Sequence, residues 1–259
     1  MKDSREEWYD PEKKVRFVAV DVRSAAQELA RSHLSGPVAA KFLSQALAAA
    51  ALLGSEMSEE EETISVQMKC SGPLGGFNVE CSSAGTLRGY TERKVLDGFD
   101  GNGDFDPKQV VGRCQYQVIR SCPGRILSSG ISNSLDGYLA GSLQRKAVIH
   151  LEAEVNNDVE ILCARGVIVE ELPDGKNTGV LAVEIGSLSR PVRLILDDFG
   201  LSQAVLKKTM PLSFACRCSP ERAARMLAAL DGGERADLPD KIDVTCHMCG
   251  RTFTVKRAE

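Results

Sequence analysis

Two close pairs of cysteines near the C-terminus are the residues in this sequence best suited to chemistry. One residue separates Cys216 from Cys218, two separate Cys246 from Cys249, and 27 residues lie between the pairs. Four thiolates in two pairs can supply the tetrahedral set of soft ligands that zinc prefers in proteins. The pattern therefore predicts one Zn²⁺ ion bound by Cys216, Cys218, Cys246 and Cys249.

The same four thiols are also candidates for a redox centre. Metal ligation holds cysteine sulfur as thiolate, which is the form that reacts with peroxide or hypochlorite. An oxidised sulfur would find a second cysteine two or three positions along the chain and could condense with it to a disulfide. The one-residue spacing of the first pair predicts a strained ring, so we expect Cys246 and Cys249 to form the easier bridge. Spacing alone leaves two uses open, a structural zinc site and a redox switch.

Other side chains are expected to support the cysteines or to pack. Three nearby arginines, Arg217, Arg222 and Arg251, would partly offset the charge of four thiolates, and His247 is expected to tune the site rather than to bind metal. His33 and His150 lie in no hydrolase motif, so we predict no catalytic residues and no enzyme. Most of the five remaining cysteines are expected to be buried as small apolar side chains: Cys70, Cys81, Cys114, Cys122 and Cys163.

Composition narrows the classes of partner. The chain has 259 residues, of which 43% are hydrophobic and 26% charged, with a net charge of −4. This balance argues against nucleic acid or an anionic membrane as a partner. The charged N-terminus, and a longest apolar run that covers only 46–53, predict neither a signal peptide nor a membrane-spanning helix. We therefore expect reduced thiols in the cytoplasm.

The pattern of apolar residues and turns predicts an α+β fold with a large N-terminal domain over 1–175. Its sheet is expected to be mostly antiparallel and packed by helices, because apolar residues alternate and turns recur from Thr63 to Ile131. An acidic run over 56–62 is expected to be a solvated loop. The further elements predicted for this domain are a strand over 15–20, a helix capped by Ser24 and ending near 32, an alanine-rich buried helix over 38–53, a helix over 134–144, and strands over 147–155 and 164–172.

The rest of the chain divides into a linker and a small domain. Residues 176–213 are expected to form a helical, metastable linker with an amphipathic helix near 197–207. In the C-terminal domain, 214–259, Ser219 is expected to cap a helix that ends near 230, and a strand follows over 252–255. Two such small elements cannot form much core, so bound metal must supply most of this domain's folding free energy.

Several short motifs, in order along the chain, resemble the redox-regulated holdase chaperones of the 33-kilodalton heat-shock (Hsp) chaperonin family. The residues that carry the resemblance are the leucine- and alanine-rich helix over 43–53, Ser71-Gly72-Pro73-Leu74, Gly85-Thr86-Leu87-Arg88-Gly89-Tyr90, the cysteine signature from Phe214 to Arg222, and Cys246-His247-Met248-Cys249 followed by Phe253. Gly89 and Tyr90 are expected to serve strand packing and a tight turn. The chain departs from the family pattern at Arg165-Gly166, where the family often has Gly-Gly.

The resemblance implies an ATP-independent chaperone that binds unfolded proteins and prevents their aggregation during oxidative stress. The reduced, zinc-bound form would be inactive. Oxidation would join the four cysteines in two disulfides, expel zinc, unfold the linker and expose apolar surface. The resemblance also implies a homodimer of the active form. The absence of a Gly-x-x-x-x-Gly-Lys-Ser/Thr sequence agrees with ATP independence.

Two alternatives use the same cysteines differently. A nucleic-acid-binding zinc ribbon would favour a basic segment, yet residues 211–259 carry eight Lys or Arg and seven Asp or Glu. A thiol oxidoreductase would place its Cys-x-x-Cys at the start of a helix in a βαβ unit, whereas Cys246 and Cys249 lie between irregular sequence and a strand.

Overall fold

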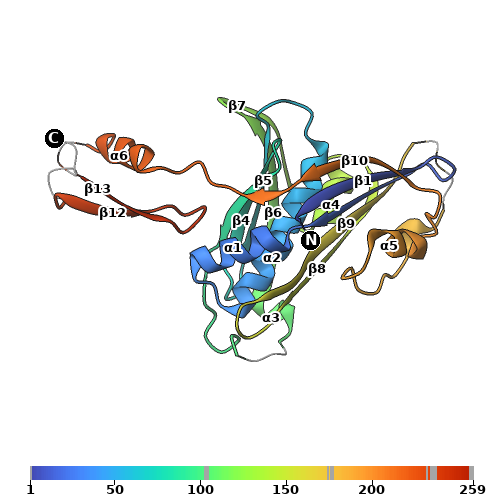
Figure 1. The fold of residues 1–259 in the computed structure, drawn as a ribbon, viewed down its shortest axis with the longest axis horizontal. Helices are drawn as coiled ribbons and strands as arrows, with labels where there is room; N and C mark the ends of the chain where they lie inside the picture. Colours follow the sequence, from blue (N-terminus) through green and yellow to red (C-terminus); the bar gives the residue numbers. More distant parts are fainter. Residues whose placement is uncertain are drawn as a thin grey trace.

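Two sheets enclose a central helix in the first part of the chain (Figure 1). The computed structural model describes residues 2–101, 105–173, 175, 178–231, 233 and 238–256. The five-stranded sheet has the order β10 (Val205–Pro211), β1 (Ser4–Asp10), β2 (Val15–Asp21), β9 (Ile161–Glu171) and β8 (Lys146–Val155). The six-stranded sheet has the order β11 (Ser213–Phe214), β5 (Thr86–Thr91), β4 (Gly76–Ser82), β3 (Thr63–Cys70), β6 (Cys114–Cys122) and β7 (Arg125–Ser132).

The strands pair antiparallel except for β11, which runs parallel to β5. The predicted α+β fold and its antiparallel hairpins over 63–131 are therefore confirmed. The helices in chain order are α1 (Arg23–His33), α2 (Pro37–Leu53), the 3-10 turn η1 (Gly54–Glu56), α3 (Pro107–Val111), α4 (Leu135–Gly141), η2 (Val180–Ala182), α5 (Val192–Asp198) and α6 (Pro220–Ala228).

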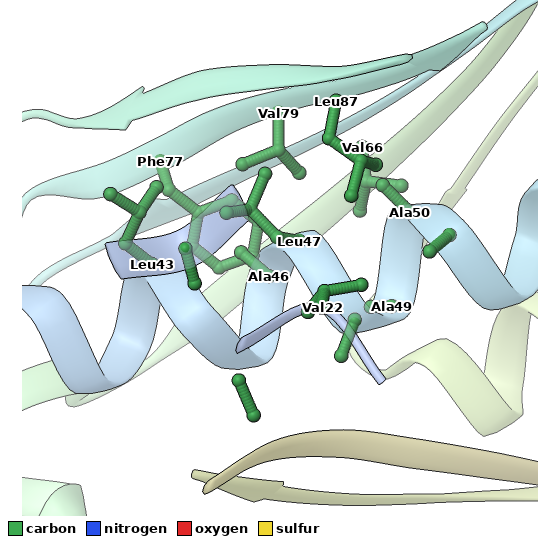
Figure 2. Packing of buried hydrophobic residues seen from close by; sticks show 14 of the residues in the cluster. Val22, Leu43, Ala46, Leu47, Ala49, Ala50, Val66, Phe77, Val79 and Leu87 are labelled. Atoms are coloured by element: carbon green, nitrogen blue, oxygen red, sulfur yellow. The ribbon is translucent and has the colours of Figure 1, made fainter. Parts of the chain in front are cut away.

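Helix α2 is the centre of the core, as its alanine-rich sequence predicts. Fourteen of its 17 residues are buried, because alanines allow both sheets to approach the helix closely. Figure 2 shows Leu43 and Leu47 directed toward Phe77 and Val79 of the six-stranded sheet. Residues Pro37–Glu56 are long and apolar enough to span a membrane by length and composition, but 78% of that apolar window is buried inside the protein. The helix is thus accounted for by the core of this domain.

The five-stranded sheet is covered on both faces, which explains why β2 is almost continuously apolar. Val18 and Val20 face α2, whereas Phe17 and Ala19 point to the opposite face. That outer face is covered by residues from 180–204, among them buried Leu188 and Phe199. The region expected to be a linker therefore packs onto the sheet.

Two expectations about helices were wrong, and strand β1 was not predicted. The helix expected near 197–207 begins and ends earlier, at Val192–Asp198, and 205–211 form strand β10 beside β1. The charged start of the chain is strand β1, whose polar side chains lie where pattern reading finds no apolar run. Val22, not Ser24, is the N-cap of α1, and the carboxylate of Asp3 accepts hydrogen bonds from the backbone N–H groups of Ser24 and Ala25.

The acidic run over 56–62 is the expected solvated loop only in its middle, where residues 58–61 are exposed; the acids at its two ends are not solvated as expected. Glu62 is fully buried and pairs with Arg120 at 2.6 Å. Glu56 pairs with Arg16 at 2.6 Å and with Arg145 at 2.5 Å. Two of the acids therefore have paired basic partners, which offset the cost of removing them from water.

The C-terminal segment has little core of its own. Helix α6 begins after Ser219, whose Oγ accepts a hydrogen bond from the N–H of Arg222 as predicted, and packs on the hairpin of β12 (Lys241–Thr245) and β13 (Thr252–Lys256). The helix ends at Ala228, slightly earlier than expected, and Gly232 lies outside the described residues. Strand β12 was missed, since its alternation is limited to two apolar residues, Ile242 and Val244, between exposed polar ones.

Candidate metal centre

The four predicted cysteines come together at the start of the C-terminal segment. Their Sγ atoms all lie within 4.8 Å of one another, with Cys216 3.8 Å from Cys246 and Cys218 3.3 Å from Cys249. The first pair lies on the extended chain between β11 and α6, and the second in the turn between β12 and β13. Cys249 is fully buried and the other three are partly buried. This arrangement can hold a metal ion.

Local sequence shapes the turn that carries the second pair. The N–H of Gly250 donates to the carbonyl of Cys246 at 2.8 Å, and the N–H of Cys246 donates to the carbonyl of Arg251 at 2.8 Å. Gly250 has a φ of +72°, which glycine adopts without strain. A Cβ at this position would also overlap the carbonyl oxygen of Ser32. Glycine therefore both closes the turn and lets it approach α1.

The turn is docked on the first domain through backbone hydrogen bonds. The N–H of Gly89 in β5 donates to the carbonyl of Met248 at 3.0 Å, and the hydroxyl of Ser32 donates to the carbonyl of Cys249. Next to the first cysteine pair, the N–H of Ala215 donates to the carbonyl of Leu87 at 3.1 Å. Both cysteine pairs are thus attached to α1 or β5.

Side chains reinforce this contact. The imidazole of His247 meets the ring of Tyr90 edge-on, with centroids 5.5 Å apart. His33 is buried, and its Nε2 lies 2.9 Å from the carbonyl oxygen of Gly89. Burial, followed by the nearby charge of Lys94, lowers the pKa of His33 to about 4. The imidazole is therefore neutral at pH 7.

The cation that reaches a ligand sulfur was not predicted as one. Arg88 in β5 donates from a guanidinium nitrogen to Sγ of Cys216 at 3.7 Å, and is held by Glu80 at 2.6 Å. Arg251, expected to offset thiolate charge, lies over the ring of Phe214 at 5.6 Å. Arg88 belongs to the Gly85–Tyr90 motif that resembles the family. A basic residue inside this strand motif was the sequence signal that could have identified it.

Arg88 contributes to an uneven electrostatic environment among the four sulfurs. Burial alone would raise the pKa of Cys216, but hydrogen bonds from the N–H of Cys218 and from Arg88 lower it to about 7. Burial raises the pKa of Cys218 and of Cys249. In the absence of a cation, Cys216 is thus a favoured thiolate.

Gly89 and Tyr90 contact the turn that carries the second cysteine pair, in addition to packing within the sheet. Gly89 lies inside β5 rather than in a tight turn, and a Cβ there would approach Val79 to 2.6 Å, so the strand-packing expectation is confirmed and the turn is wrong. The contacts of both residues with 247–248 were not foreseen, because sequence carries no signal for which strand a distant segment meets.

The five other cysteines divide by burial. Cys81 and Cys163 are buried as expected, whereas Cys70, Cys114 and Cys122 are only partly buried. The expectation that most of the five are buried as small apolar side chains is therefore wrong: it holds for two, and the other three are only partly buried.

The fold and the cysteine cluster define the class of protein: an α+β domain with a docked four-cysteine unit. A sequence model described as Hsp33 protein matches residues 6–256. The chain therefore belongs to the Hsp33 family of chaperones.

Curated relatives agree with this assignment over most of their length. The 33 kDa chaperonin of Geobacillus kaustophilus is 28% identical over 270 residues, which cover 95% of this chain and 92% of that protein. The 33 kDa chaperonin of Synechocystis is 27% identical over 273 residues, with 94% and 89% covered. The crystal structure of the 33 kDa chaperonin (heat shock protein 33 homologue) from Thermotoga maritima matches with a TM-score of 0.87 and 21% identity, covering 99% of this chain and 96% of that one, and shows the shared fold.

Proposed function

We propose that this protein is a redox-regulated, ATP-independent holdase that binds unfolded proteins in the cytoplasm when its four C-terminal cysteines are oxidised. Residues 1–175 would be the chaperone core, 176–213 a metastable linker, and 214–259 the redox-switch domain. Cys216, Cys218, Cys246 and Cys249 would act as ligands of one zinc ion when reduced and as two disulfides when oxidised. The proposal assigns no catalytic residue, no nucleic-acid partner and no membrane partner, and it includes a homodimer of the oxidised form.

The spacing of the sulfurs supports zinc as the ion. Tetrahedral Zn–S bonds of about 2.3 Å place sulfurs roughly 3.8 Å apart. Two of the sulfur pairs, at 3.8 and 3.3 Å, and the 4.8 Å upper bound for the group bracket that value. When bound, zinc would keep all four sulfurs as thiolates and so hold them in their oxidisable form.

The observation that carries the proposal is the apolar sheet face beneath the linker. Trp8, Phe17 and Val169 are buried on the outer face of the five-stranded sheet. Their cover comes from residues of 180–204 that include Leu188, Ile195, Leu196, Phe199 and Leu201. Release of this cover would expose a broad apolar surface, which is the property needed to hold unfolded chains.

The linker is connected to the cysteines along the chain. It ends in β10, which forms the edge of the five-stranded sheet and is mostly exposed, and β11 follows and leads directly to Cys216. An edge strand with little burial has few contacts to keep it in place. Loss of the thiolate cluster would free the chain on the C-terminal side of β10 and β11. Unfolding of the linker would follow from the loss of that anchor.

The test compares aggregation of an unfolding client enzyme with and without prior peroxide treatment. Zinc content and the free thiols at each cysteine are measured in the same samples by metal analysis and peptide mapping. We expect protection only after oxidation, together with loss of one zinc and of the thiols at 216, 218, 246 and 249. Fluorescence of Trp8, the single tryptophan of the chain, reports exposure of the covered face.

Serine replacement of a cysteine outside the cluster provides the matched control. Cys122→Ser removes a partly exposed thiol of β6 and should leave activation unchanged. Zinc retained after peroxide would instead identify a structural site, and protection without oxidation would contradict redox control. Salt-dependent binding to DNA or RNA, or turnover in insulin reduction, would support the alternative functions.

A further inference from the structure

We propose that Cys70 and Cys114 form a second redox pair, separate from the four-cysteine cluster, which a hydroperoxide converts to a disulfide between β3 and β6. The inference goes beyond the function proposed above because it requires neither metal nor a movement of the linker. It rests on where the strand register places two cysteines that are 44 positions apart in the sequence.

The register sets Cys70 directly opposite Cys114 at the end of the antiparallel pair β3–β6. The next residues along, Ser71 and Arg113, form a hydrogen-bonded pair, because the N–H of Ser71 donates to the carbonyl of Arg113 at 2.9 Å. The N–H of Cys70 points the other way, to the carbonyl of Gly75 at 3.1 Å. Since hydrogen-bonded and non-hydrogen-bonded pairs alternate, Cys70 and Cys114 form a non-hydrogen-bonded pair.

Non-hydrogen-bonded pairs bring opposite side chains closest together. Their Cα atoms are typically about 4.5 Å apart, which lies inside the range of about 4.4–6.8 Å found for disulfides. Directly opposite residues also share a face of the sheet. A bond between Cys70 and Cys114 therefore requires side-chain rotation rather than a change of register.

The pair lies at the accessible margin of the core. Val66 and Met68 of β3 are buried on the same face, and Cys70 continues their alternation to the end of the strand. Both Cys70 and Cys114 pack against the core cluster but are only partly buried. A small oxidant can reach them, in contrast to the fully enclosed thiol of Cys81.

The chemistry needs one equivalent of hydroperoxide. One thiol, as thiolate, attacks the peroxide oxygen, so that an S–O bond forms, the O–O bond breaks and an alcohol or water leaves with a proton. The second sulfur attacks the sulfenic sulfur, the S–S bond forms, and the hydroxyl leaves as water with the proton of the second thiol. Two electrons pass from the two sulfurs to the peroxide.

The environment makes this pair slower than a cluster of metal-bound thiolates. Burial raises the pKa of Cys70, a hydrogen bond from the N–H of Gly72 opposes this, and the neighbouring Cys114 raises it further. Less thiolate at neutral pH means slower attack on peroxide. The pair would therefore respond to stronger or longer oxidation than the cluster at Cys216.

The bond would stabilise the chaperone core under the conditions that loosen the switch. In the six-stranded sheet, β3–β4, β4–β5 and β6–β7 join strands that follow each other in the chain, whereas β3–β6 joins distant segments. A disulfide at this seam closes a long loop of the unfolded chain and so disfavours unfolding. Oxidation would thus stabilise the chaperone core and destabilise the C-terminal redox-switch domain.

Peptide mapping of the peroxide-treated full chain is the primary test. We expect a cross-linked species that contains Cys70 and Cys114, is two hydrogens lighter than the two reduced peptides, and disappears in Cys70→Ser and in Cys114→Ser. It should persist in Cys122→Ser, which removes a β6 thiol that has no cysteine opposite it: its partner in the register is Arg125. Absence of the cross-link after peroxide treatment prolonged well beyond full oxidation of the cluster thiols would overturn the proposal, as would a link from Cys70 or Cys114 to any other cysteine.

Thermal unfolding gives a second, independent readout. The oxidised wild-type chain should unfold about 5–10 °C above the identically treated double variant Cys70→Ser/Cys114→Ser. Under reducing conditions the two should differ much less. Equal midpoints after oxidation would contradict the stabilising role even if the cross-link forms.

The double variant also separates this inference from the proposed function. It should still release zinc and still lose the thiols at 216, 218, 246 and 249. If the wild type forms the new cross-link but shows no oxidation-dependent protection of a client, the holdase proposal fails while the second redox pair stands.

Discussion

The first domain and the C-terminal segment of this chain reach a folded state by different means. Helix α2 alone buries fourteen side chains between two sheets. In the described parts of 214–256, by contrast, the buried side chains are Ala223, Cys249 and Val255. The core of the first domain can support itself by apolar burial, whereas the second depends on the cysteine cluster and on its contacts with α1 and β5. One region can therefore unfold while the other stays intact.

Between them, the region 178–211 shares features of both. It buries large apolar side chains such as Leu196 and Phe199, but its helices are short and its strand lies at a sheet edge. Its stability comes mainly from the surface that it covers. The comparison predicts a hierarchy in which the C-terminal segment loosens first, the linker next and the core last.

The largest expected effect is the removal, under reducing conditions, of the metal proposed for the four-cysteine cluster. A chelator should abolish hydrogen-exchange protection over 241–256, because apparent metal-binding free energies of about 10–16 kcal/mol are folding free energy for such small units. Protection of α2 should not change. Hydrogen exchange with mass spectrometry measures both regions at once, and retained protection at β12 and β13 would contradict the comparison.

The next effect tests the core itself. Leu47→Ala removes a fully buried side chain of α2 and should lower the free energy of unfolding by about 3 kcal/mol, within the range for buried leucines. Leu34→Ala is the matched control, since that side chain is 82% exposed just beyond α1. Denaturant unfolding of the reduced protein measures both. Equal losses would show that α2 is not the centre of stability.

The sequence predicted correctly those features that are determined by residues close together in the chain. Alanines and leucines over 38–53 predicted the buried helix, Ser219-Pro220 predicted the start of α6, and four closely spaced cysteines predicted a metal cluster. Each depends on neighbours within a few positions. Local periodicity and capping chemistry suffice for such features.

Features that depend on distant partners could not be read in this way. Charged β1 is a strand because β2 and β10 flank it, and Glu62 is buried because Arg120 comes from another strand. Arg88 reaches Cys216 only after β5 and the C-terminal segment meet. Register and docking are tertiary properties, and a single sequence carries no direct record of them.

A moderate effect is expected at Arg165, where the chain departs from the family pattern. Its guanidinium donates to Asp21 at 2.9 Å and to the backbone carbonyls of Leu188 and Arg190 at 2.9 and 2.8 Å. Arg165→Ala should weaken attachment of the linker by about 1.5–3 kcal/mol, as for hydrogen bonds to a charged group. Trp8 fluorescence should then change at a lower denaturant concentration than core unfolding.

Arg193→Ala is the comparison for that variant. Arg193 also donates to a linker carbonyl, that of Ala204 at 2.9 Å, but it lies on α5 itself and over the ring of Trp8 at 4.5 Å. The Arg193→Ala variant should change Trp8 fluorescence directly, while the hydrogen bonds from Arg165 of β9 to the linker remain. If Arg165→Ala leaves the Trp8 and core transitions coincident, the linker is not a separate unit.

The smallest expected effect at neutral pH comes from His33, which lies at the contact between the two regions. Burial lowers the pKa of His33 to about 4 from its ordinary value near 6.5, so the folded state binds fewer protons than the unfolded state between these values. The contribution of neutral, buried His33 to the free energy of unfolding is fully present above about pH 6.5. Stability should fall as the pH is lowered from there toward 4. At pH 7.5 the imidazole is neutral in both the folded and the unfolded state, so its titration does not change the free energy of unfolding.

His33→Gln isolates this term, because an amide can still donate to the carbonyl of Gly89 but does not titrate. Both proteins keep the same cysteines and carboxylates, so other acid-sensitive groups cancel in the difference between them. Thermal midpoints at pH 5, 6 and 7.5 should therefore converge or cross toward pH 5, with the wild type losing more than the variant. Parallel pH profiles would mean that His33 remains solvated, and that the contact between α1 and the cysteine turn is looser than its hydrogen bonds indicate.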